Sequence, residues 1–490
     1  MSTREGVVGV GPIEDLEAVI GLEIHIQLRT ARKLFCGDST RFGDAPNTNV
    51  CPVCLALPGA LPVLNGEAVE LAIRAALAFD CEVHETSIFA RKNYFYPDLP
   101  KGYQISQFED PIASGGEFRV QMPAGEKVVR IRRMHMEEDA GKSLHDRVAG
   151  GTAVDLNRAG TPLVEMVSEP DLHSAEEARA YLQQVKQVLE YLDVSDCNME
   201  EGSLRVDANV SVRPAGTDTL GTKTELKNMN SFSGVEKAIT VEVARQSRIV
   251  AEGGEVQHVT LLWDEARGEV RPMRSKEESH DYRYFPDPDL PPLVVGRDRI
   301  EAIRQALPEL PAARRTRLEA TYALPAYDAE VLTSSRSLAD YFEAVADRSG
   351  DPKQSANWVM GPLLAVLKER GLDFESLSVS ADGLAELLAL VREGTISQGV
   401  AKDVLRKIFD SGRAAADIVQ SEGLAQVRDV GQLEGWIDQV LDAHPDELTR
   451  FREGEKRLQG FFMGEVMKAS RGKADPGEVA RMLGRKLNAS

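Results

Sequence analysis

Short apolar runs separated by polar turns dominate the first 295 positions of the chain. The strand-like runs are rich in β-branched residues and fall at residues 18–28, 128–136, 204–213 and 223–227. Longer amphipathic patterns at residues 174–192 and 234–252 predict helices, and Ser174 supplies an N-cap to the first of them. This mixture predicts an α+β domain.

The pattern changes after a turn-rich run of Pro and Asp at residues 287–292. Beyond it nearly all apolar positions recur at helical spacing, with Gly, Pro and Ser breaks at residues 351–352 and 394–399. We therefore expect three domains. They are an α+β domain at residues 1–295, an all-helical middle domain at 296–407 and a small helical tail domain at 408–490.

Composition bounds the class of protein. A chain of 490 residues with 42% hydrophobic residues is long enough for two to four domains with substantial cores. No run of about 18 apolar residues occurs, and residues 1–15 lack the apolar segment of a signal peptide. Five cysteines in this length do not make a disulfide framework. We expect a cytoplasmic protein.

The charge is unevenly distributed. The formal net charge of −20 argues against indiscriminate binding of nucleic acid, because phosphate repulsion dominates away from any local basic patch. Residues 449–490 carry ten Lys or Arg against five Asp or Glu, a local net charge of +5. Their apolar residues recur at helical spacing. The tail is thus either an RNA-contacting helical module or a set of solvated helices.

Acidic and imidazole groups lie on the strand-like segments. They are Glu23 and His25, the run from Glu137 to Asp139, and Glu165. Residues two apart on a strand share a face, so Glu23 and His25 point the same way. Carboxylates beside an imidazole suit a divalent metal, and magnesium with carboxylates and phosphate oxygens is the usual nucleotide arrangement. Single acids of this kind are more often solvated surface groups, so both interpretations remain open.

Residues 91–107 interleave cations with aromatic rings. A polyanion that carries a flat group, such as a nucleotide or an RNA end, matches this mixture, whereas a sheet edge with solvated lysines is the alternative. The residues concerned are Arg91, Lys92, Tyr94, Phe95, Tyr96, Lys101 and Tyr103.

Cysteines form a second candidate site. Cys51 and Cys54 have the spacing of a metal knuckle, and Cys36 precedes them by 15 residues. Asp38 offers a fourth ligand, since zinc accepts a carboxylate oxygen. A structural zinc site and a group of reduced, buried thiols both fit this pattern.

Many short motifs resemble, in order, those of the B subunits of the glutamyl/aspartyl-tRNA amidotransferases. They cover residues 21–25, 42–43, 46–47, 51–59, 91–98, 101–107, 136–142, 157–163, 201–211, 225–232, 273–277 and 280–289, and the tail matches at Gly460, Gly464, 466–468, 472–474 and Pro476. So many motifs in order make the resemblance highly specific.

The resemblance implies an ATP-dependent carbon–nitrogen ligase with glutamine as amido donor. Such B subunits phosphorylate the side-chain carboxylate of Glu-tRNA(Gln) or Asp-tRNA(Asn), and ammonia from a partner then gives the amide. The implied first domain resembles the catalytic fold of glutamine synthetase. The implied cofactors are ATP and Mg²⁺, with a structural Zn²⁺. The implied partners are the amidase-type glutaminase or A subunit, the small C subunit and the mischarged tRNA.

The resemblance also assigns roles to residues. Glu23, Lys92 and Glu138 are implied to act in catalysis, and the implied nucleotide contacts are Lys92, Tyr94, Lys101 and Arg205. The implied magnesium ligands are His25, Glu138, Glu165 and Asp207. The implied zinc ligands are Cys36, Asp38, Cys51 and Cys54, with Asp38 where many members carry a cysteine.

Two rival functions are weighed against this one. A non-catalytic scaffold that only holds tRNA has no use for a metal site beside Lys92. A free-standing amide ligase acting on a small carboxylic acid has no use for a basic tail. The chain also lacks the Ser-Ser-Lys amidase pattern, so ammonia must come from a partner.

Overall fold

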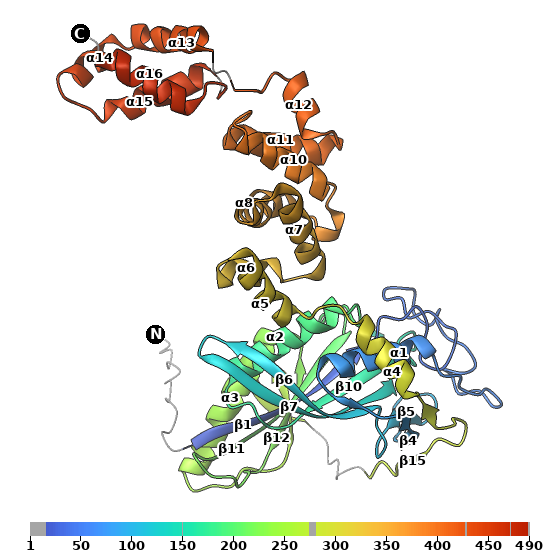
Figure 1. Ribbon diagram of the computed structural model, residues 1–490. Helices are drawn as coiled ribbons and strands as arrows, with labels where there is room; N and C mark the ends of the chain where they lie inside the picture. The colour runs from blue at the N-terminus through green and yellow to red at the C-terminus, as the bar shows by residue number, and fades with distance from the viewer. Residues whose placement is uncertain (1–15, 149, 274–280, 427–428, 471, 489–490) are drawn as a thin grey trace. The chain divides into compact units, whose positions relative to one another are not determined.

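The computed structural model in Figure 1 describes residues 16–148, 150–273, 281–426, 429–470 and 472–488. The chain divides into two compact units, Met1–Leu310 and Pro311–Ser490. Part of the predicted motif at residues 273–277, together with His280 and Arg471, lies outside the described residues. No helix within the described ranges is long and apolar enough to cross a membrane.

A nine-stranded sheet forms the centre of the first unit. Its strand order is β14-β13-β12-β11-β1-β10-β7-β6-β2, and every neighbouring pair is antiparallel except β12 and β13. Strand β1 (Leu16–Gln27) lies between β11 (Leu204–Pro214) and β10 (Pro162–Ser168). The others are β2 (Glu82–Val83), β6 (Ala113–Met122), β7 (Gly125–Glu138), β12 (Thr224–Met229), β13 (Thr260–Asp264) and β14 (Glu269–Pro272).

The two faces of this sheet differ in chemistry because side chains alternate along each strand. On β1, Ile20, Leu22, Ile24 and Ile26 are fully or almost fully buried and share one core with helices α1 (Gly66–Ala78), α2 (Ala175–Tyr191) and α3 (Phe232–Ala251). The helices pack on this apolar face (Figure 1). The intervening residues of β1 point to the opposite face, which carries the candidate site.

Smaller sheets lie beside the large one. The cation and aromatic stretch folds into the hairpin of β4 (Phe89–Asn93) and β5 (Tyr103–Gln107), joined by β15 (Phe285–Pro286). Strand β5 packs against β7, which brings the hairpin to the open face of the large sheet. Two further pairs are β16 (Leu293–Val294) with β3 (Thr86–Ser87), and β8 (Lys142–Val148) with β9 (Gly151–Asp155).

The second unit is helical and contains two hydrophobic clusters, one running from Leu318 to Val419 and one from Leu433 to Leu487. Helix α4 (Arg297–Ala306) belongs to the first unit, because Ile300 and Ile303 join its core. The three domain boundaries drawn from the sequence stay a prediction. The helices of the second unit are α5 (Pro311–Tyr322), α6 (Ala326–Leu332), α7 (Arg336–Ser349), α8 (Pro352–Trp358), η1 (Val359–Leu363), α9 (Leu364–Arg370), η2 (Phe374–Ser376), α10 (Ala381–Arg392), α11 (Gln398–Ser411), α12 (Ala415–Ser421), α13 (Val430–Ala443), α14 (Pro445–Arg452), α15 (Leu458–Ala469) and α16 (Pro476–Leu487).

The mixed α+β character of the first unit and the helical character of the rest are confirmed. Helices α2 and α3 begin and end within two residues of the predicted limits, and the Ser174 side chain accepts a hydrogen bond from the backbone N–H of Glu177, as its N-cap role requires. In the tail, Phe462 and Val466 of α15 are fully buried, in keeping with the helical spacing of its apolar residues.

Replacing Phe342 by Ala should destabilise the second unit by about 3–5 kcal/mol, because the ring is fully buried in the cluster from Leu318 to Val419. Urea unfolding of the full chain measures this. Tyr327→Ala is the matched control, since its side chain is exposed and should shift stability by less than about 0.5 kcal/mol. Equal effects of the two changes would contradict the assigned core.

Candidate active site on the open face of the sheet

Charged side chains form a band across the open face of the sheet. The antiparallel register places His25 directly opposite Glu165 on β10 and Arg205 on β11, and it places Glu23 opposite Asp207. Because alternate residues share a face, all of these side chains project from the side that the helices leave open. Segments far apart in the sequence thereby meet at one place.

A cluster of two carboxylates and two imidazoles occupies the end of this band. His25 Nε2 lies 3.5 Å from Glu165 Oε2 and 3.7 Å from Glu137 Oε1. His135 Nε2 lies 3.2 Å from Glu165 Oε2 and 3.6 Å from Glu137 Oε2. Ser106 on β5 donates a 3.2 Å hydrogen bond to Glu137 Oε2. The ligand atoms of His25, Glu137 and Glu165 all lie within 4.8 Å of one another, a spacing that fits one metal ion.

The electrostatics keep the carboxylates ionised. Burial raises the pKa of Glu165, but His135, His25 and Lys92 outweigh it and lower that pKa well below its usual value. Burial likewise raises the pKa of Glu137, and the hydrogen bond with His135 and the charge of His25 lower it overall. For His135, burial lowers the pKa while the two carboxylates raise it to about 9. The cluster is therefore a preformed anionic site.

Lys92 on β4 faces this anionic cluster. Burial would lower the pKa of its ammonium group, yet Glu137 and other acidic groups nearby raise it above its usual value. Its Nζ lies 4.9 Å from the ring centroid of Tyr282 and 6.0 Å from that of Tyr94. The tyrosine rings meet edge to face, 6.0 Å apart. The structure thus brings Lys92 and Tyr94 together beside the cluster.

Glu138 points to the other face of β7 from Glu137. Its Oε1 accepts hydrogen bonds from Lys101 Nζ and, at 2.9 Å, from the backbone N–H of Ile105. Glu137 and Glu138 are consecutive on a strand, so only one of them faces His25. The structure places Glu137 with His25 and Glu165, whereas Glu138 pairs with Lys101.

Arg205 is held by a carboxylate to which the sequence motifs assigned no role. Its two terminal nitrogens bond to the Asp139 oxygens at 2.8 and 3.1 Å, and Gln27 Nε2 donates to the same carboxylate at 2.8 Å. A bidentate pair of this kind fixes the guanidinium plane. The guanidinium of Arg205 is therefore held in place at the end of β11, and its predicted contact with a nucleotide stays a prediction.

A second acidic group lies further along the band. The carboxylate oxygens of Glu23, Asp207 and Glu225 fall within 4.8 Å of one another. Lys227 Nζ bonds to Asp207 at 2.7 Å and to Glu225 at 3.0 Å, and Asn209 donates to Glu23 at 3.0 Å. Burial, followed by the charge of Glu165, raises the pKa of Glu23. Glu23 and Asp207, which were predicted separately as a catalytic acid and a magnesium ligand, lie together here, and Lys227 neutralises part of their charge.

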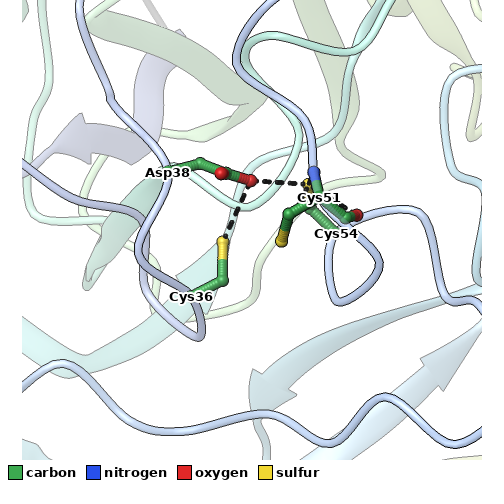
Figure 2. Close-up of side chains that lie close together, drawn as sticks. All are labelled: Cys36, Asp38, Cys51 and Cys54. Atoms are coloured by element: carbon green, nitrogen blue, oxygen red, sulfur yellow. Dashed lines mark hydrogen bonds between the residues drawn. The ribbon is translucent and has the colours of Figure 1, made fainter.

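The four residues of the predicted zinc site converge in Figure 2. Asp38 Oδ2 lies 3.5 Å from Cys36 Sγ and 3.3 Å from Cys54 Sγ, and the sulfurs of Cys51 and Cys54 are 4.0 Å apart. A tight turn holds the last two cysteines, because the N–H of Leu55 bonds to the carbonyl of Cys51 at 3.0 Å. A hydrogen bond from Cys36 lowers the pKa of Cys54 to about 6. Three sulfurs and one carboxylate oxygen are a donor set that zinc accepts.

The motifs assigned no role to Glu137 and Asp139, which belong to the acidic run, and His135 before that run was missed. A signal for His135 was present, because it lies two residues from Glu137 on a strand-like run, the spacing that also relates Glu23 to His25. Consecutive residues on a strand face opposite sides of the sheet, and the local sequence does not say which side each one faces. It therefore cannot decide whether Glu137 or Glu138 shares the face of His25.

Comparison with known proteins defines the class first. Residues 18–301, which carry the whole cluster, match the GatB/GatE catalytic domain, and residues 340–487 match the GatB domain. The chain is 52% identical over 97% of its length to the B subunit of the aspartyl/glutamyl-tRNA(Asn/Gln) amidotransferase of Myxococcus xanthus, covering 99% of that relative. It is 54% identical over 96% to the protein of the same name from Chlorobium luteolum, covering 99% of it, and 53% identical over 96% to that from Moorella thermoacetica, covering 100%.

The chain therefore belongs to the family of aspartyl/glutamyl-tRNA(Asn/Gln) amidotransferase B subunits. The resemblance drawn from the sequence motifs is confirmed.

Asp139→Asn should lower the free energy of unfolding by about 2 kcal/mol. Breaking a buried ion pair costs about 3–5 kcal/mol, and the partial exposure of Arg205 reduces that cost. Burial raises the pKa of Asp139, but Arg205 and Arg158 lower it overall. The stabilisation is thus present above the unfolded pKa of about 3.9 and is lost as the pH falls.

Urea unfolding at pH 7 and at successively lower pH measures the difference between Asp139→Asn and the unmodified chain. Asp193→Asn is the matched control, because its pair with Arg29 is exposed. A difference that grew as the pH fell would contradict the assigned pairing.

Proposed function

We propose that this chain is the carboxylate-activating component of a tRNA-dependent amidotransferase. Its family relatives carry that enzyme's name. The observation that carries the proposal is the buried anionic cluster of His25, Glu137 and Glu165 beside the charged Lys92. Ionised carboxylates that can hold metal ions, next to a cation, are what phosphoryl transfer from a nucleotide requires.

In the proposed reaction, an oxygen of the side-chain carboxylate of Glu-tRNA(Gln) or Asp-tRNA(Asn) attacks the γ-phosphorus of ATP, and ADP leaves. Ammonia then attacks the acyl carbon of the mixed anhydride, phosphate leaves with the C–O bonding pair, and the amide remains on the tRNA. The phosphorylation is needed because an oxide is a poor leaving group and phosphate is a good one. The product is Gln-tRNA(Gln) or Asn-tRNA(Asn).

His25, Glu137 and Glu165 fit a magnesium ion, and Glu23 with Asp207 fits a second one. Magnesium held by these residues would supply positive charge for the phosphate oxygens of a nucleotide. The positive charge of protonated His135 holds Glu137 and Glu165 in the ionised, ligating form. In this proposal Glu138 is a positioning residue that fixes Lys101, and Asp139 fixes Arg205.

Lys92 is proposed to meet the phosphate oxygens, since its side chain is half-buried and carries a charge beside Glu137 and Glu165. Tyr94 is proposed to contact the bound nucleotide. The arrangement of a large open sheet face around such a cluster supports a cradle like that of glutamine synthetase, which forms the same type of acyl phosphate.

The proposed partners follow from what the sequence does not carry. Ammonia would come from the glutaminase or A subunit, with the small C subunit completing the assembly. A scaffold that only binds tRNA is the competing function. The buried cluster opposes it, because burying ionised groups is costly and a scaffold gains nothing from them.

Glu137→Gln should abolish transfer of label from γ-labelled ATP to the aminoacyl group while tRNA binding stays within a few fold. The assembled complex is incubated with mischarged tRNA and magnesium but without an ammonia donor. Glu126→Gln, the same change at an exposed position of the same strand, is the matched control and should keep full transfer. Absence of any label on the aminoacyl group in the unmodified complex, with tRNA binding intact, would favour the scaffold.

Purified protein should contain about one zinc per chain after gel filtration in magnesium-free buffer, because the four donors form a closed site. Elemental analysis measures this. Cys54→Ser should lose the metal, and Cys197→Ser, a buried cysteine outside the group, should keep it. No zinc in the unmodified protein would establish the alternative of reduced thiols.

A chain ending at Gln426 should bind tRNA more weakly than the full chain, yet hydrolyse ATP normally. Its binding constant for tRNA should also fall less steeply as the salt concentration rises. The truncation removes the cluster from Leu433 to Leu487 and its basic residues, while the cores of the first unit and of residues 318–419 stay complete. Filter binding at several salt concentrations measures it. An unchanged affinity and slope would rule out the tail as an RNA contact.

A further inference from the structure

A cavity of about 610 Å³ is lined in part by Gln27 at the end of β1 and has no role in the reaction described so far. Its volume falls within the range of small-molecule sites, roughly 300–1,000 Å³. It is lined by the loop of residues 40–47, by strands β8 and β9, by the turn that follows β9, and by Gln27, Thr161 and Glu201. Gln27 connects it to the cluster, because this side chain bonds to Asp139, the partner of Arg205.

Hydrogen bonds fix the loop that forms one wall. The Asn47 side chain donates to the carbonyl of Val154 at 3.0 Å and accepts from the N–H of Leu156 at 2.8 Å. The Asp155 carboxylate accepts from the N–H of Asn47 at 3.1 Å, and Asn157 Nδ2 donates to the carbonyl of Ala45 at 2.8 Å. The cavity is therefore preformed rather than dependent on a ligand for its shape.

This fixed loop presents an aromatic ring to the cavity. Phe42 is 66% exposed, although its ring is apolar and its loop is held in place. Within the described residues it makes no ring contact with another aromatic side chain. An exposed ring on a rigid support is a stacking platform for a nucleobase.

The number of available cations in the cavity indicates whether it suits a nucleoside with one phosphate or a nucleoside triphosphate. Arg41 is paired with Asp44 at 2.8 Å, and Arg158 donates to the carbonyls of Ala140 and Gly141 at 2.9 and 2.6 Å. Lys142 is the lining cation that has no ion pair with any residue whose side chain the structure describes, a set that leaves out residues 145–149. One available cation suits a single phosphodiester, whereas a triphosphate carries several more charges and needs metal ions beside it.

Gln27 also places the cavity on the side of the sheet that carries the cluster. Gln27 and His25 are two residues apart on β1 and share a face, about 6.8 Å apart along the strand. A ligand in the cavity is therefore next to the strand that carries His25.

We propose that this cavity receives the terminal nucleoside of the aminoacylated tRNA, an adenosine, with its base stacked on Phe42 and the preceding phosphate beside Lys142. The inference rests on the proposed function, because it takes the substrate to be an aminoacylated tRNA. It adds the place where that substrate's 3′ end binds, separate from the nucleotide at Lys92 and Tyr94. Phe42 acts as a binding residue and not as a catalytic one.

The test measures binding of a stable amide-linked glutamyl- or aspartyl-adenosine to the assembled complex by equilibrium dialysis, with and without a 5′-phosphate. Phe42→Ala should weaken binding of both forms by about tenfold or more, and Phe42→Tyr should restore it, because stacking needs only the ring. Lys142→Gln should weaken the 5′-phosphorylated form alone. Leu220→Ala, an exposed apolar residue outside the cavity, is the control and should change neither.

ATP binding is measured on the same variants, because the adenosine that occupies the cavity could belong to ATP or to the end of the aminoacylated tRNA. Unchanged affinity for ATP in Phe42→Ala supports the proposal. Weaker ATP binding with unchanged binding of the aminoacyl-adenosine would overturn it and assign the cavity to ATP. No effect of Phe42→Ala on either ligand would also overturn it. Failure of the proposed function can be told apart from failure of this inference. The proposed function fails if the unmodified complex transfers no label from ATP, whereas the dialysis measures binding in the cavity independently of that assay.

Discussion

The alternation of side chains along β1 underlies both the stability and the chemistry of the first unit. Its even-numbered apolar residues, Ile20 to Ile26, are almost completely buried against the helices, while Glu23 and His25 project from the opposite face. A slip of one residue would bury the charges and expose the core, so the register is strongly determined. The same constraint that folds the sheet therefore fixes the position of the candidate active site.

The acids on that face are buried or half-buried, and most of them lie beside a counterion. His135 and Lys92 balance Glu137 and Glu165, Arg205 balances Asp139, and Lys227 balances Asp207 and Glu225. Several of these pairs join different strands, such as His135 on β7 with Glu165 on β10 and Lys227 on β12 with Asp207 on β11. Charges fixed before substrate arrives need little reorganisation during reaction, which is the condition for electrostatic stabilisation of phosphoryl transfer.

Several parts of this arrangement were readable from local patterns. The limits of α2 and α3 followed from amphipathic spacing, and the Cys51 and Cys54 pair followed from its knuckle spacing. Glu138 was expected beside His25, and Glu137 lies there instead. The two acids are consecutive on β7 and face opposite sides of the sheet, and the sequence of a strand does not say which side each residue faces. The pairing of Arg205 with Asp139 was equally hidden, because 66 residues separate them.

The sequence by itself determined the class of each segment, the family and the residue types available for chemistry, because periodicity, motif order and composition are local properties of the chain. Only the tertiary structure decided which acids share a face, which cations are already engaged by them, and that an exposed Phe42 stands over a preformed cavity next to Gln27. Those facts depend on strand register and on contacts between residues far apart in the chain, which no local pattern specifies.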